Sequence, residues 1–101
     1  MARKTKDLPI FDAAEYLDSP ADIAAYLSEA FATDDAAYIA QAIGTAARAK
    51  GMAAIAEAAG LSRENLYRSL STEGNPEFET VLRVLRALGV QLTATPSSEA
   101  A

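Results

Sequence analysis

The residues best suited to recognising another molecule lie in one polar run at positions 62–68. An arginine there can donate two hydrogen bonds to guanine O6 and N7, and a carboxylate can accept one from cytosine N4. A serine at the start of the run is a favourable helix N-cap, so the side chains after it would project from the first turns of a helix. The candidates for contacts to nucleic acid are Ser62, Arg63, Glu64, Asn65, Tyr67 and Arg68.

Several of these candidates also have a structural interpretation. Arg63 is either a base or phosphate contact or an exposed arginine on a solvated helix, and Arg68 lies one turn further on. A carboxylate in a first helical turn, such as Glu64, is already explained by the helix dipole, and Asn65 is similarly ambiguous. Tyr67 could reach the DNA backbone or pack against a neighbouring helix. We expect Arg63 to be the strongest contact of the set.

Catalysis is poorly supported by the residue types present. The chain has no histidine and no cysteine, which removes the usual bases, thiolate nucleophiles and soft metal ligands. Asp34 and Asp35 are adjacent on an expected helix, so their carboxylates would not converge on a metal ion. There is also no glycine-rich phosphate loop. We therefore expect no enzyme activity, no cofactor and no metal.

The polar run belongs to a pair of expected helices at residues 52–59 and 63–70, joined at Gly60-Leu61-Ser62. Ala56 lies four residues before Gly60, and Leu66 follows it by six. A small residue, a glycine that can adopt positive φ, and an apolar anchor at this spacing are typical of a helix-turn-helix. In that motif the second helix enters the DNA major groove by its N-terminal residues.

Four further segments complete the expected all-α domain. A short helix is predicted at residues 11–17, and a longer one after the N-cap Ser19 and Pro20. The third is capped by Thr33, has Asp34 and Asp35 in its first turn and ends at Gly51. The last, at residues 77–88, has Asn75 and Pro76 at its N-cap and first position. Its predicted inner face is Phe78, Val81, Leu82, Leu85 and Leu88.

The remaining segments divide the single domain as follows. Residues 1–7 form a basic arm, 8–32 the N-terminal helices, 33–89 the helix-turn-helix unit, and 95–101 a tail. Residues 90–94 alternate apolar and polar side chains, which predicts a short strand that would pair with a second copy or another chain. Arg48 and Lys50 end a helix, and Arg83 and Arg86 lie on the polar face of another, so neither pair requires DNA.

Composition and charge narrow the class of partner. Of the 101 residues 24 are alanine, so large apolar side chains are few and a second chain is expected to complete the burial. The net charge of −5 is uneven: residues 1–47 carry three basic and eight acidic side chains, whereas residues 48–89 carry six and five. The second half is thus free to approach phosphate. Without cysteine, a signal peptide or a membrane-length apolar run, a cytoplasmic location is expected.

The string GLSRENLYRSLSTEGNPEFETVLRVLRALGVQL resembles the C-terminal half of HigA-like addiction-module antidotes, which belong to the Cro and lambda-repressor-like helix-turn-helix group. The opening FDAAEYLDSPADIAAYLSEAF resembles the same family's N-terminal region, and together the likeness covers about residues 8–93. It implies an antitoxin that represses its own promoter and binds a small basic toxin of the RelE/ParE superfamily. DNA contacts carried over from the wider group fall on Ser62, Arg63, Glu64 and Arg68.

Two residues depart from the pattern of that group. Ser69 replaces the usual apolar residue three after Leu66, which indicates a rotated or shortened second helix. Met52 stands where many members have a polar, phosphate-touching residue. The segment 90–94 takes the place of a fifth helix.

The acidic N-terminal part is the predicted toxin-binding region. A toxin that acts on RNA must be basic, so an acidic surface is complementary to it and speeds association. Apolar anchors would supply most of the affinity, and the candidates are Phe11, Tyr16, Leu17 and Tyr26. The other interpretation is that these residues only pack the N-terminal helices together.

A homodimer is also expected, because one motif reads few bases, with half-sites about 34–36 Å apart. Its predicted interface is residues 90–94 with the exposed side of 77–88. Two other functions remain open: a stand-alone or phage-type repressor without a toxin, and an interaction module that has lost DNA binding.

Overall fold

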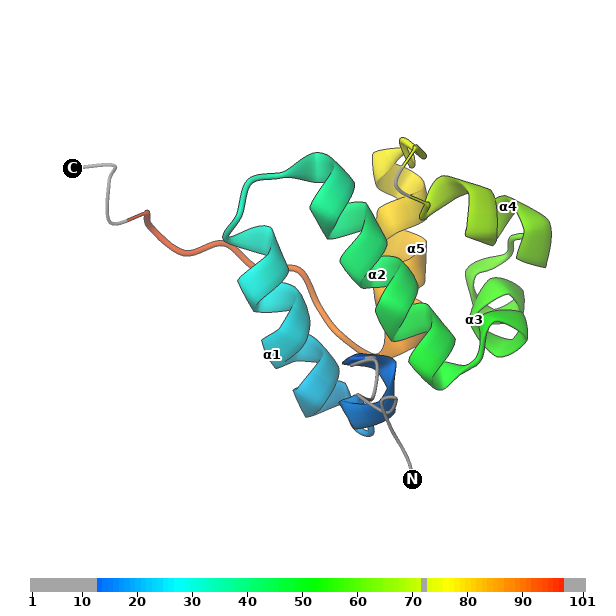
Figure 1. Cartoon of the computed structure of the whole chain (residues 1–101), viewed down its shortest axis with the longest axis horizontal. Coiled ribbons are helices and arrows are strands. Elements are labelled where there is room, and N and C mark those ends of the chain that lie inside the picture. Colours follow the sequence, from blue (N-terminus) through cyan, green and yellow to red (C-terminus); the bar gives the residue numbers. More distant parts are fainter. Residues whose placement is uncertain (1–12, 72, 98–101) are drawn as a thin grey trace, which may run out of the picture.

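The computed structural model describes residues 13–71 and 73–97. Within these ranges every regular element is helical, which confirms the predicted all-α class, and no strand is present. The arm at 1–7 and the residue Phe11 lie outside them. The elements are η1 (Ala13–Tyr16, a 3-10 turn), α1 (Pro20–Phe31), α2 (Ala36–Lys50), α3 (Met52–Ala59), α4 (Arg63–Ser69) and α5 (Phe78–Leu88). Figure 1 shows α2 through the middle, with α1 on one side and α3 and α4 on the other.

Helix α1 begins as the sequence predicts. The Ser19 hydroxyl accepts a hydrogen bond from the Asp22 N–H at 3.1 Å, and Pro20 occupies the first helical turn, where its missing N–H costs nothing. The helix buries Ile23, Leu27 and Ala30 against α2. Its opposite face is exposed and carries Asp22, Ser28 and Glu29 among alanines, so α1 has a buried side and an exposed side.

The N-cap of α2 is Asp35, and the prediction of Thr33 is wrong. The Thr33 hydroxyl instead donates to the Ala30 carbonyl at 2.7 Å and accepts from the Asp35 N–H at 3.1 Å, which closes the end of α1. Asp34 then turns the chain at φ +57°, and an Asp35 carboxylate oxygen accepts from the Tyr38 N–H at 3.2 Å. Both aspartates therefore precede α2 rather than lying in its first turn. The predicted end of α2 at Gly51 is confirmed.

Helices α3 and α4 form the predicted pair around Gly60-Leu61-Ser62. Gly60 adopts φ +76°, and the next N–H, of Leu61, bonds back to the Ala56 carbonyl at 2.9 Å. This closing pattern requires a left-handed residue, which glycine adopts without steric cost. The Ser62 hydroxyl accepts from the Asn65 N–H at 3.0 Å and so starts α4 as predicted. The helix has seven residues and ends at Ser69, one residue before the predicted end.

Helix α5 differs from the prediction at its start and in its face. Its N-cap is Glu77, which makes no side-chain capping bond, so the assignment of Asn75 and Pro76 to N-cap and first position is wrong. Val84, Leu85 and Leu88 are its buried residues. Phe78 is 65% exposed and Leu82 39% exposed, so the buried face is rotated toward Val84 and away from these two.

The core lies where α2 meets α1 on one side and α3 and α5 on the other. Small side chains occupy many of its positions, which lets the helices approach closely. The buried alanines are Ala30, Ala40, Ala42, Ala46, Ala47, Ala56 and Ala59. The largest fully buried side chains are Ile23, Leu27, Ile43, Leu66, Val84 and Leu88.

The segment 90–94 is not a strand in the structure, contrary to the prediction. The Val90 N–H closes α5 by bonding to the Leu85 carbonyl at 3.1 Å. The chain then runs past α1 (Figure 1), and Thr93, Thr95, Pro96 and Ser97 line a shallow hollow against the C-terminal end of that helix. A strand needs a neighbouring extended edge, and the described part of the chain offers none.

Candidate nucleic-acid interface

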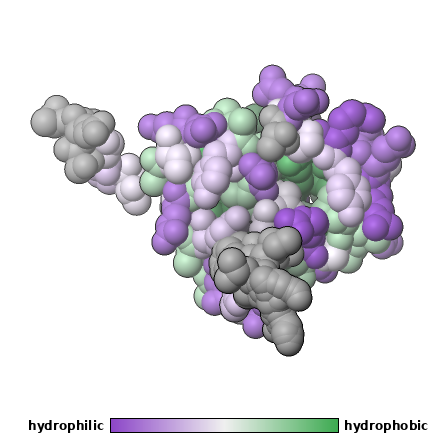
Figure 2. Space-filling model, in the orientation of Figure 1, coloured by the Kyte–Doolittle hydropathy of each residue, from purple (hydrophilic) through white to green (hydrophobic). Residues whose placement is uncertain are grey.

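Helix α4 presents nearly all of its side chains to solvent. Its one buried residue is Leu66, which packs into the core with no exposed surface. All six residues predicted from sequence are exposed: Ser62, Arg63, Glu64, Asn65, Tyr67 and Arg68. Figure 2 shows hydrophilic residues concentrated over α4 on this face of the molecule. The structure thus brings the predicted set onto one short, solvent-facing helix.

Contacts along α4 order these side chains. The Arg63 guanidinium carbon lies 5.7 Å from the centre of the Tyr67 ring, a distance at which the ring attracts a cation. One turn along, the Arg68 guanidinium donates a hydrogen bond to the Asn65 side-chain oxygen. Each arginine is therefore supported by a partner three or four residues away. Arg63 and Arg68 are held on the helix surface rather than extended freely into solvent.

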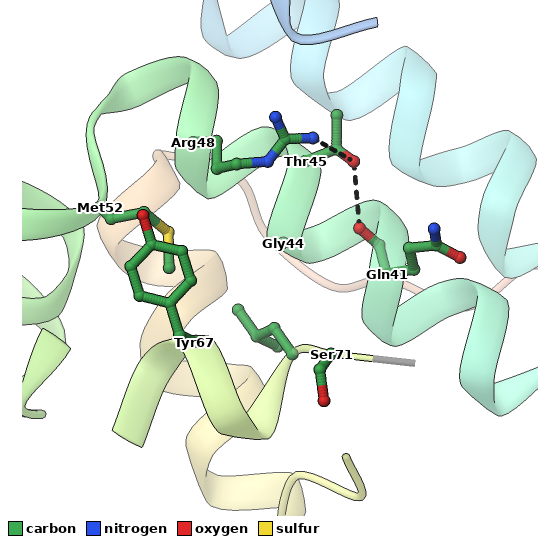
Figure 3. Close-up of a pocket in the computed structure, with 8 residues that line it drawn as sticks. Gln41, Gly44, Thr45, Arg48, Met52, Tyr67 and Ser71 are labelled. Carbon is green, nitrogen blue, oxygen red and sulfur yellow. Dashed lines mark hydrogen bonds between the residues drawn. The ribbon is translucent and has the colours of Figure 1, made fainter. Parts of the chain in front are cut away.

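A pocket of about 280 Å³ lies beside α4, between α2 and the start of α3 (Figure 3). Within it, the Thr45 hydroxyl donates to the Gln41 carbonyl at 3.1 Å and accepts from an Arg48 guanidinium nitrogen at 3.4 Å. Thr45 is only 8% exposed. We call this cavity the Arg48 pocket. It is lined by Gln41, Gly44, Thr45, Arg48, Met52, Tyr67, Leu70 and Ser71.

No pattern in the sequence predicts the Arg48 pocket. Arg48 and Tyr67 belong to different helices, and only tertiary packing brings them to one cavity. From sequence, the position of Arg48 in the last turn of α2 is fully explained by the favourable interaction of a cation with the helix dipole. Met52 is 6% exposed and belongs to the core.

The surface of residues 13–47 is acidic, in contrast to α4 with its two arginines. This stretch carries six carboxylates and no basic side chain, and all six are exposed: Glu15, Asp18, Asp22, Glu29, Asp34 and Asp35. Of the predicted toxin anchors, Tyr16 is 63% exposed and Tyr26 is partly buried against the core. Leu17 is 7% exposed, so it packs in the core and is not available as an anchor. Phe11 lies outside the described residues.

Comparison with known proteins assigns the chain to a family. A family model described as "probable addiction module antidote protein" matches residues 7–96. The chain belongs to this family. Membership supports an antitoxin role and implies a toxin as partner.

A curated relative agrees in extent with the family match. The chain is 45% identical over 93 residues to an uncharacterized protein of Haemophilus influenzae (strain ATCC 51907 / DSM 11121 / KW20 / Rd). The match covers 92% of this chain and 96% of the relative. No solved structure matches. No helix in the described part of the antidote has the length and apolar character needed to span a lipid bilayer.

Proposed function

We propose that the antidote represses its own operon by inserting α4 into the major groove of operator DNA. The observation that carries this proposal is the exposure of every α4 side chain from Arg63 to Arg68 except Leu66. A helix with one anchor and a free polar surface suits insertion into a groove that admits an α-helix. On this view α3 and α4 form a helix-turn-helix of the Cro and lambda-repressor-like group, within a HigA-like protein.

Within that arrangement the two arginines of α4 and its capping serine have distinct roles. Arg63, in the first turn, donates to guanine O6 and N7, and its approach is ordered by the Tyr67 ring. Arg68 lies in the last turn of α4, and its guanidinium donates a hydrogen bond to the Asn65 side-chain oxygen. We expect Arg68 to contact the phosphates at the edge of the groove. Ser62 contributes chiefly by capping, because its oxygen already accepts the Asn65 N–H.

The test of DNA binding is a gel shift with the full chain and the DNA upstream of its own gene, at two salt concentrations. We expect a discrete complex that weakens as salt rises, because bound counterions are released from the phosphates. A scrambled duplex of equal length serves as the control for sequence preference. Equal affinity for both duplexes, or no complex with either, would contradict operator binding.

We propose further that the acidic surface of residues 13–35 receives a small basic toxin of the RelE/ParE type. Six exposed carboxylates without an intervening cation make this surface electrostatically complementary to a protein that binds RNA. Tyr16, whose ring is largely exposed, supplies an apolar anchor, and Tyr26 on α1 is partly buried against the core. Arginine and lysine side chains of the toxin would meet the carboxylates around it.

Point variants test this surface better than truncation does. Removal of residues 1–32 would also take Ile23, Leu27 and Ala30 out of the core, so binding and folding would be lost together. We expect Tyr16→Ala to weaken the toxin complex about tenfold or more, as for a central aromatic anchor. Tyr38→Ala, which alters a second exposed tyrosine, is the control. Equal toxin affinity for both variants would place the anchor elsewhere.

The dimer is the third part of the proposal. Phe78, Leu82 and Leu92 are exposed, and Leu82 and Leu92 line one hollow between α5 and the segment after it. A twofold contact through this face would cover these three side chains. Deleting residues 91–101 leaves the Val90 closure of α5 intact, and we expect a monomer by light scattering at micromolar concentration. A deletion variant that stays dimeric would place the interface elsewhere.

A further inference from the structure

Helix α5 has an exposed aromatic ring at its start and an open hollow near its end. Phe78, the first residue of the helix, is 65% exposed. The hollow has a volume of about 360 Å³, and we call it the α5 hollow. An apolar cavity of about 150 Å³ can bind benzene, so the α5 hollow has room for a phenyl ring. It is lined by Leu82, Leu85, Arg86, Val90, Gln91 and Leu92.

The ring and the hollow of one chain do not meet. Phe78 is not among the lining residues, and it lies eight residues before Arg86, which is about 12 Å along the helix axis. Leu82 lies midway between them, four residues from each, so the three residues follow one face of α5. A second copy that packs its α5 antiparallel, with the twofold axis at Leu82, would place each Phe78 opposite the Arg86 of the other copy.

The charges along α5 favour the antiparallel arrangement. Glu77 and Glu79 lie at the start of the helix, and Arg83 and Arg86 lie in its second half. Antiparallel pairing therefore sets the acidic start of one helix beside the basic end of the other, whereas parallel pairing would bring like charges together. Arg86 also suits an aromatic occupant of the hollow, because a guanidinium is attracted to the face of a ring.

We propose that the α5 hollow of each protomer receives the Phe78 ring of a second copy of this chain. This inference rests on the proposed dimer and names the contact that forms it. The site is incomplete in one copy, since the ring that fills it comes from the other. Both copies supply the same ring and the same hollow, so the contact occurs twice and the assembly closes as a dimer.

Light scattering on the full chain over a series of micromolar concentrations tests the contact. Phe78→Ala removes the ring, and Leu92→Arg removes an apolar wall of the hollow and adds a cation beside Arg86. We expect each variant to be monomeric at concentrations at which the parent is dimeric. Tyr38→Ala alters an exposed aromatic residue of α2 and should stay dimeric. Circular dichroism checks that each variant is folded.

Mixing the two variants tests whether the contact is reciprocal. The Phe78→Ala chain keeps its hollow and the Leu92→Arg chain keeps its ring, so a heterodimer retains one of the two contacts. We expect the equimolar mixture to dimerise more strongly than either variant alone, and more weakly than the parent. A mixture that associates no better than its components would overturn the proposal, because burial of an apolar surface without this pairing gives no such rescue.

A cross-link reports the register of the two helices independently. The chain has no cysteine, so a single introduced thiol can pair only with its counterpart in another copy. Leu82→Cys places this thiol at the proposed twofold axis, and oxidation should link two copies, since a disulfide needs Cα atoms about 4.4–6.8 Å apart. Arg83→Cys is the matched control, because the Arg83 side chain lies beside Gly60 and away from the axis. Equal cross-linking of the two variants would overturn the register, and this result holds if Leu92→Arg does not fold.

The outcomes separate this inference from the dimer on which it rests. A parent chain that stays monomeric throughout the concentration series would overturn both. A dimeric parent whose mass is unchanged by Phe78→Ala would overturn the contact between Phe78 and the α5 hollow alone, and the dimer interface would then lie elsewhere.

Discussion

Helices α1 and α4 begin with the same capping residue but differ in how much of their surface they bury. Both begin at a serine whose hydroxyl accepts a backbone N–H three residues on. Helix α1 has twelve residues and buries three of them, whereas α4 has seven and buries one. The exposed side of α1 carries carboxylates, and α4 carries two arginines. A long helix with three anchors is part of the scaffold, while a short one with a single anchor is chiefly surface.

The comparison shows that surfaces of opposite charge lie on separate helices of one small domain. The acidic and basic surfaces lie on different helices, and α2 packs directly on α1 and, on its other side, on α3 and α5. Neither surface needs the other's side chains. The following predictions test whether a substitution in one of the two helices leaves the stability and binding contributions of the other unchanged.

The largest effect is expected from removing the anchor of α4. Leu66→Ala should lower the free energy of unfolding by about 2–5 kcal/mol, because it removes a fully buried leucine and leaves a cavity. Urea denaturation followed by circular dichroism measures this. Leu92→Ala, at a 41% exposed position, is the control and should cost about 0.5 kcal/mol or less. Equal losses would show that α4 is not held by Leu66.

Next in size is the loss of the base contact. Arg63→Ala should lower discrimination for operator DNA by about 1–3 kcal/mol and relax the preference at one position of each half-site. Fluorescence anisotropy with single-base variants of the duplex measures both effects. Toxin affinity should not change, since α4 lies apart from the acidic surface. If the variant keeps the base preference of the parent, Arg63 does not contact a base.

The two serine caps allow a matched comparison. Ser62→Ala and Ser19→Ala should each cost about 1 kcal/mol of stability, because each removes the acceptor for one N–H. Only Ser62→Ala should also weaken DNA binding, since it frays the first turn of α4. Thermal melts and anisotropy on the same samples separate the two effects. Equal losses of DNA affinity would mean that α1 and α4 are coupled.

The smallest effect concerns the acidic surface. Asp18→Asn together with Glu29→Gln removes two of six exposed carboxylates from residues 13–35. Association with the toxin should slow by about two- to fivefold at low salt and less at high salt, as electrostatic steering predicts. Stopped-flow mixing at two ionic strengths measures this, with DNA affinity as the control. An unchanged association rate would argue for a toxin site elsewhere.

The parts of the fold that sequence predicted are those decided within a few residues. The caps at Ser19 and Ser62 and the helix ends at Gly51, Gly60 and Gly89 each depend on one local hydrogen-bonding pattern. The cap of α2 was missed because Thr33, Asp34 and Asp35 are all acceptable caps. Only the bond from Thr33 to α1 decides among them.

The remaining differences depend on which surfaces meet. In α5, Leu82 lies three residues before Leu85, and Val84 lies three residues after Val81 and four before Leu88. Either set has helical spacing, so periodicity alone could not choose the buried face. Contact with α2 and α3 selects Val84. The α4 candidates could be found because they are consecutive in sequence. Arg48 could not, since its relation to Tyr67 exists only after folding.

Gly44 has a consequence for protein engineering. A β-carbon at this position in the middle of α2 would lie 3.1 Å from the Leu70 carbonyl oxygen and 3.3 Å from the Leu70 Cβ. Glycine inside a helix costs about 1 kcal/mol relative to alanine, so the chain accepts a weaker α2 in exchange for close contact with the end of α4. Gly44→Ala would require Leu70 to move by a few tenths of an ångström, which sets the gain in helix propensity of α2 against strain at the end of α4. A single methyl group at position 44 would therefore act on the packing of α2 against the end of α4 while leaving every charged side chain in place.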